Sequence, residues 1–279
     1  MIIAILSGKG GTGKTFVSVN LVAATENAVY LDCDVEEPNG RLFLKPQQLV
    51  SAPVTVLLPT IDRDKCNGCR QCVEFCRFNA LAFVRDNPMI FAEICHSCGG
   101  CALVCPEQAI SEIPREVGKV EKGVSGGVHI VTGILNVGEP SAVPVIKQVL
   151  NGNQPEKPLT VVDCPPGSSC SVIESVSQAD YCLLVAEPTA FGLHNLKMVR
   201  HLVQLLQKPC GIIINKADGE YPPLEQFCAE TNTPILLRIP YDKHIAERTA
   251  AGEIIVREDH LMKEVFLGLL GRIENEAKR

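Results

Sequence analysis

The stretch "SGKGGTGKT" at residues 7–15 decides the fold of this chain. It follows an apolar, strand-like run, "IIAIL" at 2–6, and leads into "TFVSVNLVAAT" at 15–25, which reads as a helix. Residues Gly8 to Thr15 fit the pattern GxxxxGK[ST], and the order strand, loop, helix makes that pattern informative. We identify the stretch as a phosphate-binding loop, because its glycines let successive backbone N–H groups turn towards phosphate oxygens and the helix N-terminus behind them favours negative charge.

The residue types of this loop predict its contacts. Lys14 is expected to reach the β- and γ-phosphates of a nucleotide, and the hydroxyl of Thr15 to bind Mg²⁺. The other expected nucleotide contacts in the loop are Gly8, Lys9, Gly10, Gly11, Thr12 and Gly13.

A second lysine inside the loop, Lys9, indicates which class of phosphate-binding loop this is. The resulting pattern KGGxGK[ST] resembles the deviant Walker A loop of the class that includes MinD, ParA and the nitrogenase iron protein. In that class the extra lysine reaches across a dimer to the partner's nucleotide. The resemblance therefore implies ATP hydrolysis by a homodimer, or by a heterodimer with a paralogue, with Lys9, Lys14 and Asp34 in catalytic roles. Taken alone, Lys9 has the simpler interpretation of a solvated loop lysine.

Two further strand-like segments end in acidic residues. "AVYLDCDVEEPN" (28–39) is an apolar strand followed by carboxylates, and "LTVVDCPPG" (159–167) ends its strand at Asp163. The resemblance implies that Asp34 faces the attacking water and the Mg²⁺ shell, and that Asp163 holds Mg²⁺ directly or through water. For Asp32, a structural hydrogen bond and a role in the site stay equally open.

Two later positions complete the implied nucleotide site. Gly167 would let the backbone approach the γ-phosphate, and Asn215, which closes the buried run "CGIIINKAD" (210–218), contacts the adenine in the family. A hydrogen-bonded turn asparagine is the alternative for Asn215. "LLRIPYD" (236–242) resembles the late strand whose following loop covers the base.

Eight of the fourteen cysteines form two CxxCxxCxxxC motifs, "CNGCRQCVEFC" (66–76) and "CHSCGGCALVC" (95–105). Each cysteine of the second motif lies 29 residues after its counterpart, so the segment is an internal duplication. Three such cysteines on a tight loop can converge on one iron–sulfur cube, and the fourth ligates the other cluster. The expected [4Fe–4S] ligand sets are Cys66, Cys69, Cys72 and Cys105 for the first cluster, and Cys95, Cys98, Cys101 and Cys76 for the second.

Zinc is the alternative metal for these cysteines, but it commonly takes two separated CxxC or Cys/His pairs, which this compact duplicated run does not resemble. The segment resembles a bacterial-type two-cluster ferredoxin over roughly residues 60–115. It departs from that pattern at Arg77, since Pro106 follows the last cysteine of the second motif. We expect Arg77 to change the surroundings of a cluster rather than its presence. Each of the six scattered cysteines is expected to be a small buried residue.

Strand-like runs alternate with helical stretches along the rest of the chain. The runs lie at 2–6, 28–32, 128–132, 159–163, 181–185, 210–214 and 234–239. This alternation predicts an α/β fold with a mostly parallel sheet, helices on both faces and the phosphate site at the carboxyl ends of the strands. The predicted division is a discontinuous P-loop ATPase domain, 1–58 and 117–279, interrupted by a small inserted α+β ferredoxin domain at 59–116.

Composition excludes other classes of protein. A net charge of −6 argues against a general nucleic-acid binder. No apolar run reaches the length that crosses a bilayer, and Met1 leads directly into a strand, so we expect a cytoplasmic protein. The amphipathic segment 260–278 carries charges of both signs, which favours a core-packing helix over a membrane anchor.

Together these features predict a Mg²⁺-dependent ATPase, slow without its partner, that couples nucleotide-dependent dimerisation to electron transfer with a redox or iron–sulfur protein. Two alternatives stay open. One is an ATPase for iron–sulfur cluster assembly or delivery, although the C-terminal CxxC of Mrp-type ATPases is missing, since no cysteine follows Cys228. The other is spatial organisation as in MinD or ParA, with the ferredoxin as a redox sensor. Cys170 lies where a cluster bridging two subunits would be held, but a structural or redox-sensing role is favoured.

Overall fold

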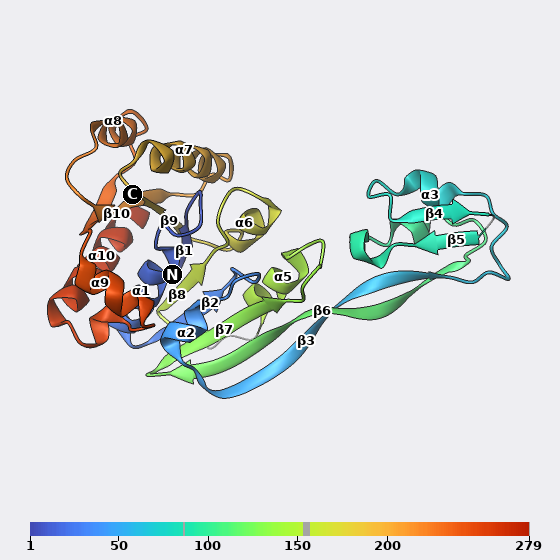
Figure 1. Ribbon diagram of the computed structural model, residues 1–279, viewed down its shortest axis with the longest axis horizontal. Coiled ribbons are helices and arrows are strands. Elements are labelled where there is room, and N and C mark those ends of the chain that lie inside the picture. The colour runs from blue at the N-terminus through green and yellow to red at the C-terminus, as the bar shows by residue number, and fades with distance from the viewer. Residues whose placement is uncertain (86, 153–156, 279) are drawn as a thin grey trace.

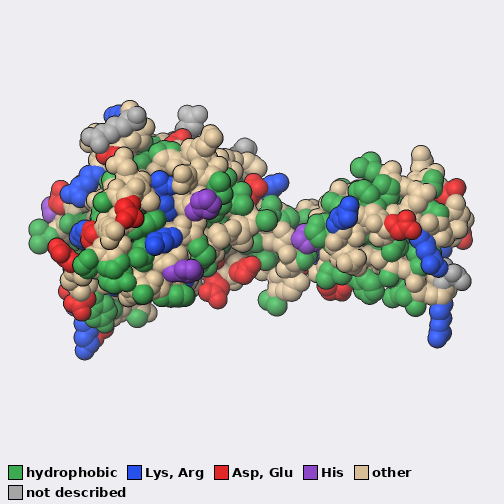
Figure 2. Space-filling view, turned by 90° about the horizontal axis from the view of Figure 1, so that it is seen from above, with side chains coloured by type: hydrophobic (Ala, Val, Ile, Leu, Met, Phe, Trp, Pro, Cys, Tyr) green, Lys and Arg blue, Asp and Glu red, His purple; other side chains and the backbone are tan. Residues whose placement is uncertain are grey.

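The chain folds into a large α/β lobe and a small lobe, which a long two-stranded ribbon joins (Figure 1). The structure is a computed structural model that describes residues 1–85, 87–152 and 157–278. In the space-filling view the two lobes are separated by a narrow waist (Figure 2).

The described part of the large lobe is built on a nine-stranded sheet of order β11-β10-β9-β1-β8-β2-β7-β6-β3. The strands from β11 to β7 are parallel, which confirms the predicted mostly parallel sheet. They are near-continuous apolar runs because helices cover both faces of the sheet. These strands are β1 (Ile2–Leu6), β2 (Ala28–Asp32), β7 (Val128–Leu135), β8 (Leu159–Asp163), β9 (Tyr181–Ala186), β10 (Cys210–Ala217) and β11 (Ile235–Pro240).

Two apolar cores lie on the two faces of this sheet. One is formed with α5 (Val143–Asn151), α6 (Cys170–Ser175), α7 (Ala190–Leu205) and α8 (Pro222–Glu230). The other is formed with α1 (Lys14–Thr25), α2 (Gly40–Leu44), η2 (Ile255–Arg257) and α10 (His260–Ala277), beside α9 (Lys243–Ala250).

The C-terminal helix α10 packs in the core, as predicted. Phe266, Leu269 and Ile273 are buried, and the ring of Phe266 meets Phe16 of α1 edge-on with centroids 6.3 Å apart. Among the described residues, no helix combines the length and the apolar character that crossing a membrane requires.

The ribbon is the main feature that the sequence analysis did not predict. β3 (Gln47–Ile61) pairs antiparallel with β6 (Ile110–Ser125) along its whole length, from Gln47 opposite Val124 to Ile61 opposite Ile110. The half of β6 nearer the large lobe also pairs with β7, whereas the far half reaches out to the small lobe (Figure 1). The expected domain boundaries, 59 and 116, each fall inside one of these strands. Two prolines within β3, Pro53 and Pro59, make this stretch resemble a loop in the sequence.

The small lobe repeats one backbone pattern twice. Its elements are α3 (Gln71–Phe75), β4 (Leu81–Val84), β5 (Asn87–Ile90), η1 (Ala92–Ile94) and α4 (Gly100–Leu103). Three pairs of residues, each pair 29 positions apart, share a left-handed backbone: Gly68 and Ser97, Arg70 and Gly99, Asn79 and Gln108. The amides of Ala80 and Ala109, again 29 positions apart, donate to the sulfurs of Cys76 and Cys105 at 3.3 Å. The duplication in the sequence is therefore a duplication of structure.

Candidate functional site

The phosphate-binding loop connects β1 to α1, and the helix begins at Lys14. The residue before it, Gly13, has φ +98°, and a Cβ there would lie 2.2 Å from Nδ2 of Asn215. A side chain at this position would be strained by the backbone and would collide with a neighbour. The glycine therefore keeps the loop tight against the first turn of α1.

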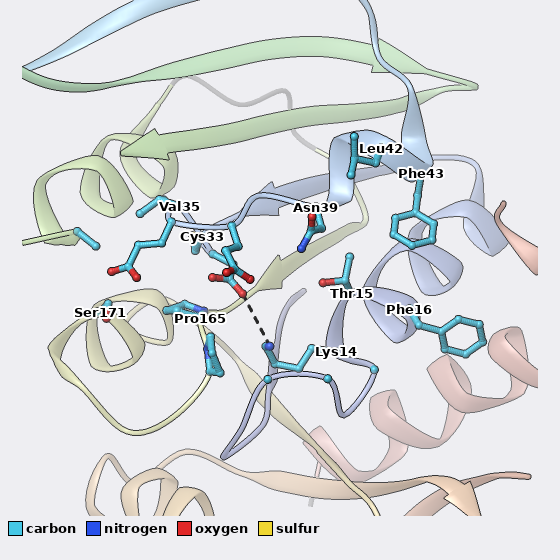
Figure 3. Close-up of a pocket in the computed structure, with 18 of the residues that line it drawn as sticks. Lys14, Thr15, Phe16, Cys33, Val35, Asn39, Leu42, Phe43, Pro165 and Ser171 are labelled. Carbon is cyan, nitrogen blue, oxygen red and sulfur yellow. Dashed lines mark ion pairs between the residues drawn. The ribbon is translucent and has the colours of Figure 1, made fainter. Parts of the chain in front are cut away.

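A cavity of about 900 Å³ opens at the carboxyl ends of the strands (Figure 3). Its walls come from the loop, from the acidic segment after β2, from the segment after β8 and from α2. The lining includes Gly10, Gly11, Gly13, Lys14, Thr15, Asp34, Asn39, Ala142, Pro165 and Ser171. Chain segments that are far apart in the sequence thus meet around one space, as the parallel sheet requires.

Lys14 and Asp34 face each other across this cavity. The ammonium of Lys14, whose side chain is only 6% exposed, lies 3.8 Å from a carboxylate oxygen of Asp34 (dashed line in Figure 3). Burial raises the pKa of Asp34 to about 6, although the Lys14 charge opposes the shift and Asp163 adds to it. Asp34 is therefore ionised at neutral pH and protonates in mildly acidic solution.

Asp163 lies beneath the cavity on β8 and is 1% exposed. Its Oδ2 accepts a hydrogen bond from the Tyr30 hydroxyl at 2.8 Å, whereas its Oδ1 is buried and has no hydrogen-bond partner in the described chain. Burial raises the pKa of Asp163, and the Lys14 charge opposes this. On the neighbouring strand, Asp32 accepts a hydrogen bond from the Gly40 amide at 3.1 Å, so the structural role left open for Asp32 is present.

A second cavity of about 330 Å³ adjoins the first and shares Gly11, Gly13 and Phe16 with it. Its other walls include Tyr241 and Ile245, from the segment that the sequence associates with the base. Asn215 lines this cavity too, and its Nδ2 donates to the Thr12 carbonyl at 2.7 Å. Asn215 therefore braces the phosphate-binding loop, which agrees with the hydrogen-bonded alternative, and contact with a base stays a prediction.

Lys9 lies outside both cavities. Its ammonium is 2.6 Å from Glu187, which follows β9, and 5.3 Å from the centre of the Phe191 ring. Glu187 also holds Lys216 at 2.7 Å, and although burial raises the pKa of Glu187, its hydrogen bonds with Lys216 and Lys9 outweigh burial and lower it. Sequence reasoning missed this acidic partner, since nothing near Lys9 in the sequence points to a residue 178 positions away.

The remaining expected loop and switch residues support the cavities without lining the larger one. Gly8 packs on helix α7, where a Cβ would lie 2.5 Å from the Asn195 carbonyl oxygen. Thr12 is buried, and the Gly167 amide donates to the Ser7 carbonyl at 2.9 Å. These residues hold the loop and the segment after β8 together.

The eight motif cysteines divide between two cavities of the small lobe. One, which encloses only about 10 Å³, is lined by Cys66, Cys69, Cys72 and Cys105, and the other, of about 240 Å³, by Cys76, Cys95, Cys98 and Cys101. Each cavity contains one expected ligand set and no cysteine of the other.

Both cysteine sets share one feature with the ligands of iron–sulfur clusters, backbone amides that donate to a sulfur. The second cavity is lined mainly by apolar residues and its thiols, together with Arg77 and His96, and backbone amides point at the sulfurs of Cys76, Cys95 and Cys105. Thiolate ligands with amide donors to the sulfurs are typical of iron–sulfur proteins. Within the described ranges, no three His, Cys, Asp or Glu side chains converge closely enough to hold one metal ion.

The scattered cysteines follow expectation with two exceptions. Cys33, Cys164, Cys182 and Cys228 are buried, as expected of small apolar residues. Cys210 is half-buried, and Cys170, at the start of α6, is exposed, so the expectation of burial is wrong for Cys170. It lies in the segment that continues from β8 around the large cavity, where solvent reaches the chain.

Comparison with known proteins places the chain in a family. A family profile described as the CobQ/CobB/MinD/ParA nucleotide binding domain matches residues 3–255. The uncharacterized protein MJ0578 of Methanocaldococcus jannaschii is 34% identical over 209 residues, 72% of this chain and 73% of that protein. An uncharacterized ferredoxin of the same organism, MJ0722, is 41% identical over 54 residues, 18% of this chain and 70% of its own length.

Solved structures share the fold. The septum site-determining protein MinD of Pyrococcus horikoshii, complexed with Mg-ADP, is 21% identical with a TM-score of 0.58, and 96% of this chain and 93% of that chain are covered. The cell division ATPase MinD of Pyrococcus furiosus is 19% identical with a TM-score of 0.60, covering 98% of each chain. The matched profile, the relative and the cavity at the phosphate-binding loop agree, and the chain belongs to the CobQ/CobB/MinD/ParA family of nucleotide-binding domains.

Proposed function

We propose that this protein is a Mg²⁺-dependent ATPase that couples nucleotide-driven dimerisation to electron transfer with a redox or iron–sulfur protein partner in the cytoplasm. The proposal rests on one observation: a chain with the nucleotide-binding fold also has two cavities, each lined by the four cysteines of one expected ligand set. When bound there, two [4Fe–4S] clusters would supply one-electron transfer. Residues 59–116 would form the ferredoxin domain, inserted between residues 1–58 and 117–279 of the ATPase domain.

The nucleotide site provides the groups that phosphate transfer to water requires. Backbone amides of the loop and the N-terminus of α1, which begins at Lys14, would bind phosphate oxygens, and Thr15 and Asp163 would supply oxygen ligands for Mg²⁺. The unpaired, buried Oδ1 of Asp163 supports this assignment, because such an oxygen is costly unless a cation or its water satisfies it.

Lys14 and Asp34 would exchange partners when nucleotide binds. The phosphates attract Lys14 away from the carboxylate that lies 3.8 Å from it, which leaves Asp34 able to accept a hydrogen bond from the attacking water. In the nucleotide-free chain the pKa of Asp34 is about 6, with Lys14 acting to lower it, so Asp34 is ionised at neutral pH before the nucleotide binds.

Dimerisation would complete the site through Lys9. Within one chain this lysine is paired with Glu187, so it must give up that carboxylate to reach the nucleotide of a second chain. The Lys9 side chain is 27% exposed, and partly exposed ion pairs are weak enough to exchange. A single chain should therefore hydrolyse ATP slowly, and a homodimer or a heterodimer with a paralogue should be faster.

The test is a pair of variants prepared without oxygen and compared with the wild-type protein for iron content and ATP hydrolysis. Lys14→Ala should keep its iron and lose hydrolysis. Cys98→Ser should lose part of its iron and keep basal hydrolysis, and any difference in rate between reduced and oxidised protein should become smaller.

The outcomes separate the parts of the proposal. Wild-type protein without Mg²⁺-dependent hydrolysis would contradict the ATPase, and wild-type protein without iron and sulfide would contradict the electron carrier. Equal rates in the reduced and oxidised states, with and without a reducing partner, would contradict the coupling.

A further inference from the structure

One buried hydroxyl in the nucleotide site has no part in the roles described above. Tyr30, on β2, is fully buried, and its hydroxyl donates to Oδ2 of Asp163 on β8 at 2.8 Å. The two strands are neighbours in the sheet, with Tyr30 opposite Val161. Because side chains alternate along a strand, Tyr30, Asp32 and Asp163 lie on the same face of the sheet.

The Tyr30 ring has no room to move away from this hydrogen bond. Gly40, the first residue of α2, lies against it, and a Cβ at Gly40 would come within 2.1 Å of the hydroxyl oxygen. The amide of Gly40 is held in turn by Oδ2 of Asp32 at 3.1 Å. A glycine backbone therefore closes the space around the ring and keeps the hydroxyl aimed at Asp163.

The consequence for Asp163 is that Tyr30 holds one carboxylate oxygen, while the other has no hydrogen bond of ordinary geometry in the described chain. Oδ2 accepts from Tyr30, while Oδ1 is buried without a hydrogen-bond partner among the described residues. The Asp163 side chain lies below the phosphate-binding loop, where hydrogen bonding from the hydroxyls of Thr15 and Ser18 acts to lower its pKa, although neither hydroxyl makes a hydrogen bond of ordinary geometry to Oδ1. Hard divalent cations and their bound waters take oxygen ligands, so the free oxygen suits a cation bound beside the phosphates.

We propose that Tyr30 is a positioning residue for the divalent cation: its hydroxyl fixes the rotation of the Asp163 carboxylate so that Oδ1 stays directed at the ion. This inference rests on the proposed Mg²⁺-dependent nucleotide site and deepens it. Hydrogen bonds to ligating carboxylates orient them, and losing one typically weakens metal binding. Tyr30 contributes through Asp163 and does not itself touch the nucleotide.

The test is Tyr30→Phe in the full chain, because phenylalanine keeps the ring and removes only the donor. The chain offers a matched control in Tyr181→Phe on β9. Tyr181 is equally buried, but its hydroxyl has no hydrogen-bond partner in the described part of the chain. Binding of a fluorescent ATP analogue is measured without metal and during a titration with Mg²⁺, and thermal unfolding is followed for each variant.

For Tyr30→Phe we expect the Mg²⁺ concentration at half-saturation to rise about tenfold, with the metal-free affinity for nucleotide unchanged. Tyr181→Phe should leave both quantities at the wild-type values. In an Asp163→Asn background, adding Tyr30→Phe should cause no further change, because the two residues act as one unit.

Three results would overturn the inference. They are an unchanged half-saturation in folded Tyr30→Phe, an equal loss of nucleotide affinity with and without metal, and a full effect of Tyr30→Phe when Asp163 is already asparagine. Wild-type protein whose nucleotide binding ignores Mg²⁺ would overturn the proposed function together with this inference. A normal wild-type response that Tyr30→Phe leaves intact would overturn this inference alone.

Discussion

Replacing Glu139 by glutamine should lower the free energy of unfolding by about 2 kcal/mol. Glu139 lies in the loop between β7 and α5 and binds Arg115 of β6 through both carboxylate oxygens, each 2.7 Å from a guanidinium nitrogen. Only 9% of the Glu139 side chain and 25% of the Arg115 side chain are exposed. Glutamine keeps the shape and removes the charge, which leaves the guanidinium mostly buried without a counter-charge.

The magnitude follows from the burial of the pair. Removing one partner of a fully buried ion pair costs about 3–5 kcal/mol, and the exposed quarter of Arg115 reduces this because solvent screens its charge. The Arg115 Nε is already buried without a hydrogen-bond partner in the described chain, so this guanidinium is poorly placed to lose another contact.

A second pair in the same chain is a control of the same geometry and greater exposure. Arg238 binds both oxygens of Glu225 at 2.6 Å, with 46% and 29% of the two side chains exposed. Glu225→Gln should therefore cost less than about 1 kcal/mol, and 1 M salt should remove most of that cost.

The assay is urea unfolding of anaerobically prepared protein, followed by circular dichroism because the chain has no tryptophan. Equal costs for Glu139→Gln and Glu225→Gln would refute the argument that burial sets the strength of these pairs. So would a loss below about 0.5 kcal/mol for Glu139→Gln, since that is within the range of ordinary surface substitutions.

Three further outcomes follow from the site. Asp34→Asn should stabilise metal-free, nucleotide-free protein by about 1–2 kcal/mol at pH 8. Urea titrations should show this gain vanishing towards pH 4, because the raised pKa of about 6 means that folding disfavours only the ionised carboxylate. A gain independent of pH would contradict the assignment. Gly13→Ala should abolish nucleotide binding in a calorimetric titration, because φ is +98° and a Cβ would lie 2.2 Å from Asn215; wild-type affinity would show that the loop relaxes. Cys98→Ser should reduce the iron bound per chain to about half, whereas Cys170→Ser, which lies outside both cavities, should leave the iron content unchanged. Iron analysis of the two variants measures this, and equal losses of iron would contradict the two ligand sets.

The strands and the phosphate-binding loop were predictable because their signals are local. Uninterrupted apolar runs such as 181–185 indicate buried parallel strands, and each predicted run overlaps a strand of the structure. The two cysteine sets were predictable from the spacing of the motifs, because in a duplicated motif the fourth cysteine of each copy is expected to ligate the cluster of the other copy. The structure lines each cavity with one of those sets.

The ribbon was not predictable because its partners are far apart and its strands are exposed. β3 pairs with β6 across the whole inserted segment, and β3 carries Pro53 and Pro59, which favour a loop assignment. Residues 47–53 are all exposed, and the few buried ribbon residues, such as Val54, Val117 and Val120, are too scattered to give the sustained alternation of apolar and polar residues that reveals a strand. The expected boundaries at 59 and 116 therefore fall inside continuous strands, and the division into two domains stays a prediction.

The sequence by itself determined the family, the position of the candidate phosphate-binding loop and the division of eight cysteines between two cavities, because each of these depends on residues close together in the chain. Only the tertiary structure decided what each polar side chain touches: Glu187 for Lys9, the Thr12 carbonyl for Asn215, and Tyr30 for Asp163. These contacts span 133 to 203 residues. They arise because parallel strands bring their carboxyl ends to one edge of the sheet, where a buried polar atom must bond whichever partner the fold places beside it.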